Sequence, residues 1–130
     1  MAEHPNVQIM MRANEAFSKG DIAALKEIIA EDAVWHVPGK SILAGNYQGH
    51  EEIFGFFGRL MELSGGTFKA DLHDITASHE HAVNLDRLTG RRGEKILDIN
   101  LALVVHIEEG KIKEAWDVFT DLYAWDDFWS

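Results

Sequence analysis

The segment Leu101-Ala-Leu-Val-Val-His-Ile-Glu-Glu-Gly-Lys-Ile-Lys-Glu-Ala-Trp-Asp-Val-Phe119 decides the fold, because it reads as two strands joined by a tight turn. Glu109-Gly110 occupies the turn, and a pairing of residues 108 and 111 across it sets the register. Since strand side chains alternate between the two faces of a sheet, this register sorts them. It predicts one apolar face, whose only charge is Glu114 and whose other members are Leu101, Leu103, Val105, Ile107, Ile112, Trp116 and Val118.

The opposite face of this hairpin carries Asn100, Ala102, Val104, His106, Lys113, Ala115, Asp117 and Phe119. Toward the end far from the turn it has small side chains, one carboxylate, one amide and one aromatic ring, a composition typical of a small-molecule cavity. The apolar face then needs another cover, because monomers rarely expose such a patch. We therefore expect a homodimer through the convex face of the sheet, formed by Leu97, Ile99, Leu101, Leu103, Val105, Trp116 and Val118.

Length and composition indicate a globular chain with a single domain over residues 1–130, since 46% of the residues are hydrophobic. A net charge of −10 repels nucleic-acid phosphates, so we expect no nucleic-acid partner. No apolar run approaches the roughly 20 residues of a membrane span, so we expect no membrane partner either. The start of the chain, Met1-Ala-Glu-His-Pro5, lacks the features of a signal peptide, which favours a cytoplasmic protein.

Helical spacing of apolar residues dominates the first half of the chain, and strand-like alternation dominates the second. A first helix begins near Pro5 and ends at Gly20, a second begins after Asp21, and a third runs from Gly49 to Gly65. A short strand is expected at 33–37, followed by a loop with Tyr47, and an antiparallel meander is expected at 67–77, 82–91, 95–108 and 111–120. Three helices must then cover one face of a curved sheet, which is an α+β fold.

The pattern resembles the SnoaL-like family of the nuclear transport factor 2-like fold, which is related to polyketide cyclases and ketosteroid isomerases. The segments that carry the resemblance are Ala30-Glu-Asp-Ala-Val-Trp-His-Val-Pro-Gly39, Ala44-Gly-Asn-Tyr-Gln-Gly-His-Glu-Glu-Ile-Phe54 and Glu109-Gly-Lys-Ile-Lys-Glu-Ala-Trp-Asp-Val118. The resemblance covers essentially the whole chain. It implies a cone-shaped domain, with three N-terminal helices packed on a strongly curved, mainly antiparallel sheet and a mostly apolar pocket between them. The fold hosts enzymes and binding proteins alike.

Few of that family's catalytic positions match this chain. The general base of ketosteroid isomerases, just before the proline that ends the first strand, falls on Val37. The first helix has no tyrosine for their oxyanion hole; Met10, Ala13 and Asn14 stand in that neighbourhood. The cyclases carry an acid/base aspartate after a tryptophan on the last strand, and Glu114-Ala-Trp-Asp117 resembles that motif. The resemblance thus implies Asp117 as a catalytic acid/base.

Asp117 also has a physical case of its own. It lies between Ala115 and Phe119 on the proposed cavity face, and the expected register places Ala102 opposite. An apolar, partly dry environment disfavours the charged carboxylate and raises its pKa toward values useful for proton transfer. A polar contact to a ligand and a purely structural hydrogen bond are the alternatives.

Further candidates are placed by strand arithmetic. A turn at Arg92-Gly93 pairs Arg87 with Asp98, so these two form either a cross-strand ion pair or, with Asn100, a polar network at the pocket floor. His36 points away from the pocket by strict alternation, but the Pro-Gly that follows permits a bulge, so His36 is kept as a second catalytic candidate. The expected lining residues are Trp35, Val37, Phe17, Tyr47, Phe56, Phe57, Phe68, Ala102 and Phe119.

The seven histidines show no metal-binding spacing, and no phosphate-binding loop or cysteine nucleophile is present. We therefore expect neither a metal nor a cofactor. Two functions remain open. One is a cofactor-independent isomerase, cyclase or lyase that acts on a small hydrophobic cyclic or polyketide-like molecule. The other is a non-catalytic, dimeric small-molecule-binding domain.

Overall fold

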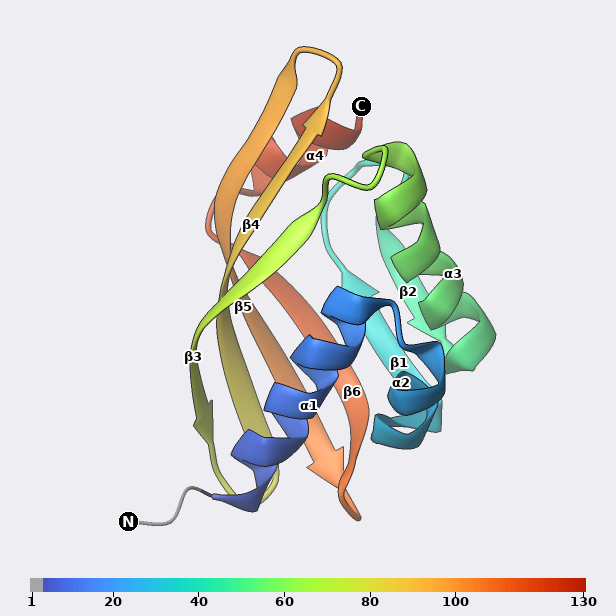
Figure 1. Cartoon of the computed structure of the whole chain (residues 1–130), viewed down its shortest axis with the longest axis vertical. Coiled ribbons are helices and arrows are strands. Elements are labelled where there is room, and N and C mark those ends of the chain that lie inside the picture. Colours follow the sequence, from blue (N-terminus) through green and yellow to red (C-terminus); the bar gives the residue numbers. More distant parts are fainter. Residues whose placement is uncertain (1–3) are drawn as a thin grey trace.

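A computed structural model describes residues 4–130. Of the segment Met1 to Pro5, on which the expected absence of a signal peptide rests, residues 1–3 lie outside the described residues. Four helices and a six-stranded sheet make up the fold (Figure 1). The elements are α1 (Pro5–Lys19), α2 (Ile22–Ile28), β1 (Ile29–Val37), β2 (Gly45–Gln48), α3 (Gly49–Leu63), β3 (Lys69–Ala77), β4 (His81–Arg92), β5 (Lys95–Glu108), β6 (Lys111–Phe119) and α4 (Leu122–Trp129).

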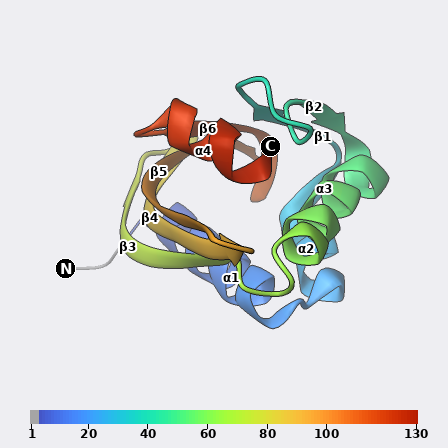
Figure 2. The same cartoon turned by 90° about the horizontal axis from the view of Figure 1, so that it is seen from above.

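The sheet has the strand order β2-β1-β6-β5-β4-β3, in which β1 and β6 are parallel and all other neighbours are antiparallel. The predicted meander β3 to β6 is therefore confirmed. Tyr47 lies in β2, a short edge strand, and not in the expected loop. Helices α1, α2 and α3 lie along the concave side of the curved sheet (Figures 1 and 2), which confirms the predicted α+β class.

The predicted C-terminal end of α1 and the predicted start of α2 are also confirmed. Gly20 ends α1 with a φ of +67°, a left-handed conformation that glycine adopts without a side-chain clash. Asp21 then caps α2, because its Oδ1 accepts a hydrogen bond from the backbone N–H of Ala24 at 3.1 Å. Within residues 4–130, no helix is long and apolar enough to cross a membrane.

One extra residue in β6 changes the predicted register of the central hairpin. The turn forms at Glu109-Gly110, whose φ angles of +52° and +77° match a type I′ turn, and residues 108 and 111 pair as expected. Beyond the turn, Ile107 pairs with Ile112 but His106 pairs with Glu114. Lys113 is thus a β-bulge, an unpaired residue that shifts everything after it by one position.

Because a shift of one residue exchanges the two faces of a strand, the bulge overturns the predicted division of the hairpin. Asp117 lies opposite Leu103, not Ala102, and Phe119 lies opposite Leu101. The apolar row of β5 therefore faces the helices together with Asp117. The members of this row that are buried within the single chain are Leu97, Ile99, Leu101, Val105 and Ile107.

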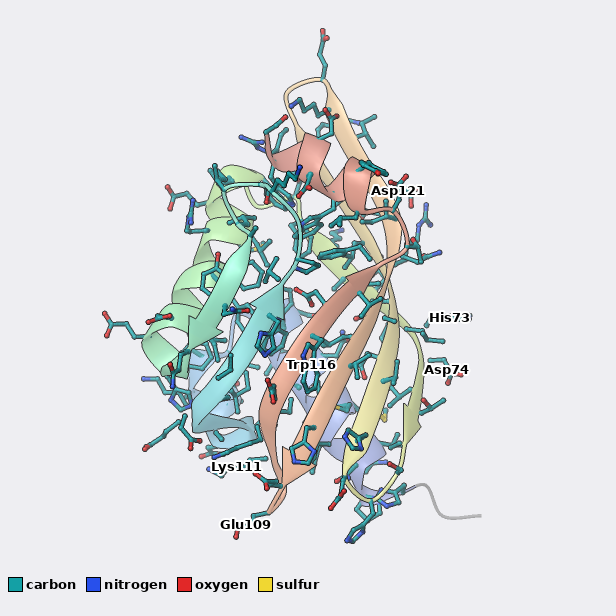
Figure 3. All side chains as sticks on the ribbon, turned by 180° about the vertical axis from the view of Figure 1, so that it is seen from behind. His73, Asp74, Glu109, Lys111, Trp116 and Asp121 are labelled. Atoms are coloured by element: carbon teal, nitrogen blue, oxygen red, sulfur yellow. The ribbon has the colours of Figure 1, made fainter. Side chains whose placement is uncertain are left out.

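Most of the residues that were proposed for the homodimer interface therefore face the helices of their own chain. Of the proposed interface, only Trp116 and Val118 lie on the convex face, where Val118 is exposed and Trp116 is half-buried. Figure 3 views the molecule from this side and shows Trp116 on the outer face of β6. Dimerisation itself stays a prediction.

The C-terminal aromatic segment forms α4, a helix that the sequence reading did not anticipate. Asp121 caps it by accepting from the N–H of Ala124 at 3.0 Å. The helix packs against β5, at the end of the sheet where Figure 1 shows the turn between β4 and β5. The three side chains that it buries almost completely are Trp125, Phe128 and Trp129. The aromatic tail therefore completes the core of its own chain.

Hydrogen bonds to a loop and to the Arg92 guanidinium hold α4 in place. The Asp126 carboxylate accepts hydrogen bonds from the backbone N–H groups of Lys40 and Ser41. Gly39, with a φ of +104°, allows this approach, because a Cβ there would lie 2.3 Å from the Asp126 Oδ1. At the other end, the Arg92 guanidinium donates to the Phe128 carbonyl at 2.7 Å.

Candidate functional site

A cavity of about 90 Å³ lies between α1, α3, α4 and the concave face of the sheet. One enclosed water molecule needs about 10–15 Å³ of such space, so the cavity has room for several waters or a small ligand. Aromatic and aliphatic side chains form most of its wall. Its polar members are Asn14, Asn84, Asp86 and Asp117, and none of its described lining residues is cationic.

Asp117 lies on β6, after the bulge at Lys113, and the shifted register directs its side chain toward the helices. Its Oδ2 accepts a hydrogen bond from the Trp35 Nε1 at 3.3 Å. Burial raises the pKa of Asp117 to about 7; the Trp35 hydrogen bond opposes this rise, and the nearby Asp86 adds to it. Near neutral pH the carboxyl group therefore exists in both protonation states, as proton transfer requires.

Asp86 and Asn84 are cavity residues that the sequence reading missed. They lie on the concave face of β4, where only 5% of Asp86 and 3% of Asn84 is exposed. Burial, and secondarily the charge of Asp71, raises the pKa of Asp86 to about 6. The Oδ1 atoms of both side chains are buried and have no hydrogen-bond partner among residues 4–130. The alternation Ala82, Asn84, Asp86, Leu88 was the available signal, since its two ends are plainly core residues.

Aromatic rings form the wall around these polar groups. The Phe57 ring packs edge-on against Phe17, with centroids 5.2 Å apart, and against Trp35, with centroids 5.1 Å apart. Phe119 stacks on Trp125 with ring centroids 4.0 Å apart. The structure thus places Phe17, Trp35, Phe57 and Phe119 at the cavity, together with Phe56, Phe68 and the residues Met10, Ala13 and Asn14 of α1.

Two of the expected lining residues lie just outside the cavity. Val37 is buried at the end of β1 but does not line the space. The Tyr47 ring stacks on Phe56, and its hydroxyl donates to the Leu43 carbonyl at 2.7 Å. Tyr47 therefore supports the wall from behind and offers its hydroxyl to the backbone.

The predicted polar floor lies on the convex face. The Arg87 guanidinium donates to both carboxylate oxygens of Asp98, at 2.9 and 2.7 Å, in an exposed ion pair. Arg87 itself pairs with Asn100, because the turn falls at Gly93-Glu94, and Asn100 is exposed. Ala102 shares this outer face. The cross-strand ion pair, one of the two predicted alternatives for Arg87 and Asp98, is therefore confirmed. The other alternative, a polar floor of the pocket, and the placement of Ala102 at the cavity were wrong, because nothing in the sequence marks the bulge that separates their face from that of Asp117.

His36 also lies outside the cavity, as strict strand alternation indicates. Its Nδ1 bonds to the Asn46 Oδ1 at 2.6 Å and its Nε2 to the Glu114 Oε2 at 2.5 Å. Its ring stacks on Trp116, which Figure 3 shows on the outer face of β6. Desolvation lowers the pKa of His36, but the bonds to Glu114 and Asn46 outweigh it, so the pKa is raised overall. His36 belongs to an outer polar cluster and contacts no cavity group.

The histidines do not assemble into a metal centre in the described part of the chain. Among residues 4–130, no three His, Asp or Glu side chains gather in an arrangement suited to a metal ion.

A sequence profile of the SnoaL-like domain matches residues 11–115, which is most of the chain. The chain belongs to the SnoaL-like family. Among solved structures, Bal32a from a soil-derived mobile gene cassette is 39% identical, with a TM-score of 0.94 and 97% of each chain covered.

More distant structures agree on the fold. A nuclear transport factor 2-like protein from Burkholderia xenovorans LB400 is 21% identical, with a TM-score of 0.84 over 100% of this chain and 99% of that one. IdmH, a proposed polyketide cyclase from Streptomyces antibioticus, is 20% identical, with a TM-score of 0.74 over 90% of this chain and 93% of that one. The fold is therefore nuclear transport factor 2-like, and a proposed polyketide cyclase shares it.

Proposed function

We propose that this SnoaL-like protein is a cofactor-independent isomerase, cyclase or lyase that acts on a small hydrophobic cyclic or polyketide-like molecule. The observation that carries the proposal is Asp117, a carboxyl group buried at an apolar cavity, whose pKa is raised to about 7. The likeness to IdmH supports the substrate class, because a proposed polyketide cyclase shares this fold.

The proposed chemistry is proton transfer at carbon. The Asp117 carboxylate accepts a proton from a C–H next to a carbonyl group, and the resulting carboxylic acid returns it at another position of the substrate. Trp35 orients the carboxyl group through its Nε1. A dry, aromatic wall keeps the base poorly solvated and therefore reactive. Return of the proton to another carbon gives isomerisation. In ring closure the enolate carbon instead bonds to a second carbonyl carbon of the substrate, whose C=O π bond breaks, and the protonated Asp117 gives its proton to the alkoxide oxygen that forms.

Hydrogen–deuterium exchange tests this step without knowledge of the natural substrate. The probe is 2-tetralone in D₂O, and the loss of its α-proton signals is followed by NMR. The wild-type protein should accelerate exchange, and Asp117→Asn should lower the acceleration by about 10²-fold or more, because general acid/base catalysis is worth about 10²–10⁴-fold. Asp98→Asn is the matched control: it makes the same change on the outer face and should leave exchange unaltered.

The pH profile adds an independent check. If the carboxylate is the base, the exchange rate should rise with pH and level off above the Asp117 pKa of about 7. Full exchange activity in Asp117→Asn would remove this residue from the mechanism.

A non-catalytic binding protein is the second candidate. Val37 favours it, because that position carries the general base in the related ketosteroid isomerases and is apolar here. Binding of 2-tetralone without any acceleration of exchange by the wild-type protein would support this function. A second chain on the convex face, through Trp116 and Val118, remains part of either proposal.

A further inference from the structure

Besides Asp117, the cavity is lined by two polar side chains, Asn84 and Asp86, that the proposed proton transfer does not use. Asn84 and Asp86 lie two positions apart on the same face of β4, and one oxygen of each has no hydrogen-bond partner. Leaving a buried polar atom unpaired costs free energy, so such atoms are uncommon unless a ligand or water completes them. Two of them, side by side at one cavity, indicate a binding site for a polar group.

The sheet register places this pair two strands away from Asp117 on the same concave face. Asn84 pairs with Leu103, which pairs in turn with Asp117; Asp86 pairs with Leu101, which pairs with Phe119. Since neighbouring strands lie about 4.8 Å apart, the backbones of β4 and β6 are separated by about 10 Å. The side chains reach inward from both strands, so the remaining span suits one ring or two fused rings lying over the leucines of β5.

The chemistry of the pair matches a hydroxyl group. A hydroxyl donates one hydrogen bond and accepts others. The Asp86 carboxylate can accept a hydrogen bond from the hydroxyl group. The Asn84 amide can donate one to the hydroxyl oxygen after a half-turn of its terminal group, which exchanges its oxygen and nitrogen. An ammonium group fits less well, because it brings three donors to two unpaired oxygens. A carboxylate ligand would meet Asp86 and Asp117 with no cation among the lining residues.

We propose that Asn84 and Asp86 form a hydroxyl-binding subsite, which holds a neutral one- or two-ring ligand by its hydroxyl group so that the opposite edge of the ring lies against Asp117. The inference rests on the proposed function only in that both place the ligand in the same cavity. It identifies the ligand class as a hydroxylated, uncharged ring compound, such as a phenol or a cyclic alcohol.

Calorimetric binding of two matched pairs of probes to the full chain tests the proposal. These are 2-naphthol with 2-methoxynaphthalene, and phenol with anisole. The methyl ethers keep the oxygen and the ring but lack the donor. A hydrogen bond to a charged group corresponds to about tenfold or more in affinity, so at least one hydroxyl probe should bind about tenfold more tightly than its ether. Benzylammonium and 2-naphthoate should bind more weakly than either hydroxyl probe.

Substitutions at Asp86 test whether the preference for the hydroxyl probe over its methyl ether comes from Asn84 and Asp86. Asp86→Leu should abolish the preference for the hydroxyl and retain binding of the ether. Asp86→Asn, which keeps the shape, should reduce the preference to a few-fold and guards against a folding defect in the leucine variant. Asp98→Leu, on the outer face, should leave it intact. Equal affinity for hydroxyl and ether, an unchanged preference in both Asp86 variants, tighter binding of benzylammonium, or no binding of any probe would each overturn the subsite.

The two proposals fail separately. Asp117→Asn should keep the hydroxyl preference while it loses proton exchange. If Asp117→Asn exchanges normally but Asp86→Leu loses the preference, the subsite stands and the catalytic role of Asp117 falls. If the preference survives in Asp86→Leu and Asp86→Asn, the subsite falls whatever the exchange experiment shows.

Discussion

The two faces of the sheet hold aspartates of opposite character. On the convex face, Asp98 is exposed and ion-paired with Arg87, and the hydrogen bond from that guanidinium holds the pKa of Asp98 below its ordinary value. On the concave face, Asp86 is buried and unpaired by any cation, and burial raises its pKa to about 6. Asp98 and Asp86 come from adjacent strands. The face onto which a side chain projects therefore decides whether its carboxyl group is a surface charge or a group able to exchange protons.

The bulge at Lys113 sets this division on β6. It turns Asp117 toward the cavity and Glu114 toward the outer cluster with His36. Without it, Asp117 would lie on the outer face beside Val104 and Ala102. A single unpaired residue thus controls whether the candidate acid/base reaches the cavity.

Among the changes that test the difference between the two faces, deletion of Lys113 should have the largest effect on stability. The deletion would restore the unbulged register, so that either Asp117 and its neighbours leave the cavity or β6 loses its pairing with β5. We expect a loss comparable to the whole stability of a small domain, about 5–15 kcal/mol, and therefore an unfolded chain by circular dichroism. Lys113→Ala is the matched control: it keeps the bulge and removes only the exposed ion pair with Asp32, so folding should persist. A folded deletion variant with unchanged cavity binding would show that the bulge does not set the faces.

The same bulge marks the limit of what the sequence could predict. The C-terminal end of α1 at Gly20, the start of α2 at Asp21, the turn at Glu109-Gly110 and the meander β3 to β6 follow from local rules and were predicted correctly, whereas β2 and α4 were missed. The face assignment is not local, because it depends on an extra residue that no turn or proline marks. A global argument was available: the most apolar row of the central strand, which includes Leu101 and Val105, should face the helices.

The site shows the same pattern of success and failure. Asp117 and the aromatic wall were named from the family motif and from strand parity near the helices. Asp86 was missed because its parity was tied to Arg87 and Asp98 through the unbulged register. The helix formed by the aromatic segment after Asp121 was not predicted, since eight residues carry too little periodicity to distinguish a helix from a loop.

The pH dependence of stability should separate the two kinds of aspartate. For Asp117, the folded-state pKa of about 7 lies above the unfolded value of about 3.9, so the folded state binds more protons between these values and stability falls as pH rises through that window. The slope for one carboxyl group is at most about 1.4 kcal/mol per pH unit, which amounts to about 4 kcal/mol over about three units.

Chemical denaturation of wild type and Asp117→Asn at pH 4, 5.5 and 7.5 measures this difference. The variant should lose the Asp117 part of the slope and gain stability relative to wild type as pH rises. Asp98→Asn should behave in the opposite sense: the lowered pKa of Asp98 stabilises the fold above its unfolded pKa of about 3.9, and that contribution is lost below this value, where a further measurement at pH 3 detects it. Parallel pH profiles for wild type and Asp117→Asn would mean that the buried carboxyl group is not destabilised by its surroundings.

The smallest of the expected effects compares a valine on each face. Val105 is completely buried on the concave face, while 51% of Val118 is exposed on the convex face. Val105→Ala removes two buried methyl groups and leaves a small cavity, so it should lower the free energy of unfolding by about 2 kcal/mol. Val118→Ala should stay within about 0.5 kcal/mol in a monomer. Both changes replace the same residue in a strand, so the difference in intrinsic strand preference largely cancels.

The stability of the Val105→Ala and Val118→Ala variants, measured at several protein concentrations, tests the predicted homodimer. A partner that binds only the folded chain makes the apparent stability depend on concentration. If a second chain covers the convex face, Val118→Ala should become as costly as Val105→Ala at high concentration, and sedimentation should show that it weakens self-association. If Val118→Ala stays neutral from micromolar to millimolar protein, the convex face is a solvent-exposed surface. The contrast between the two faces then resides within one chain.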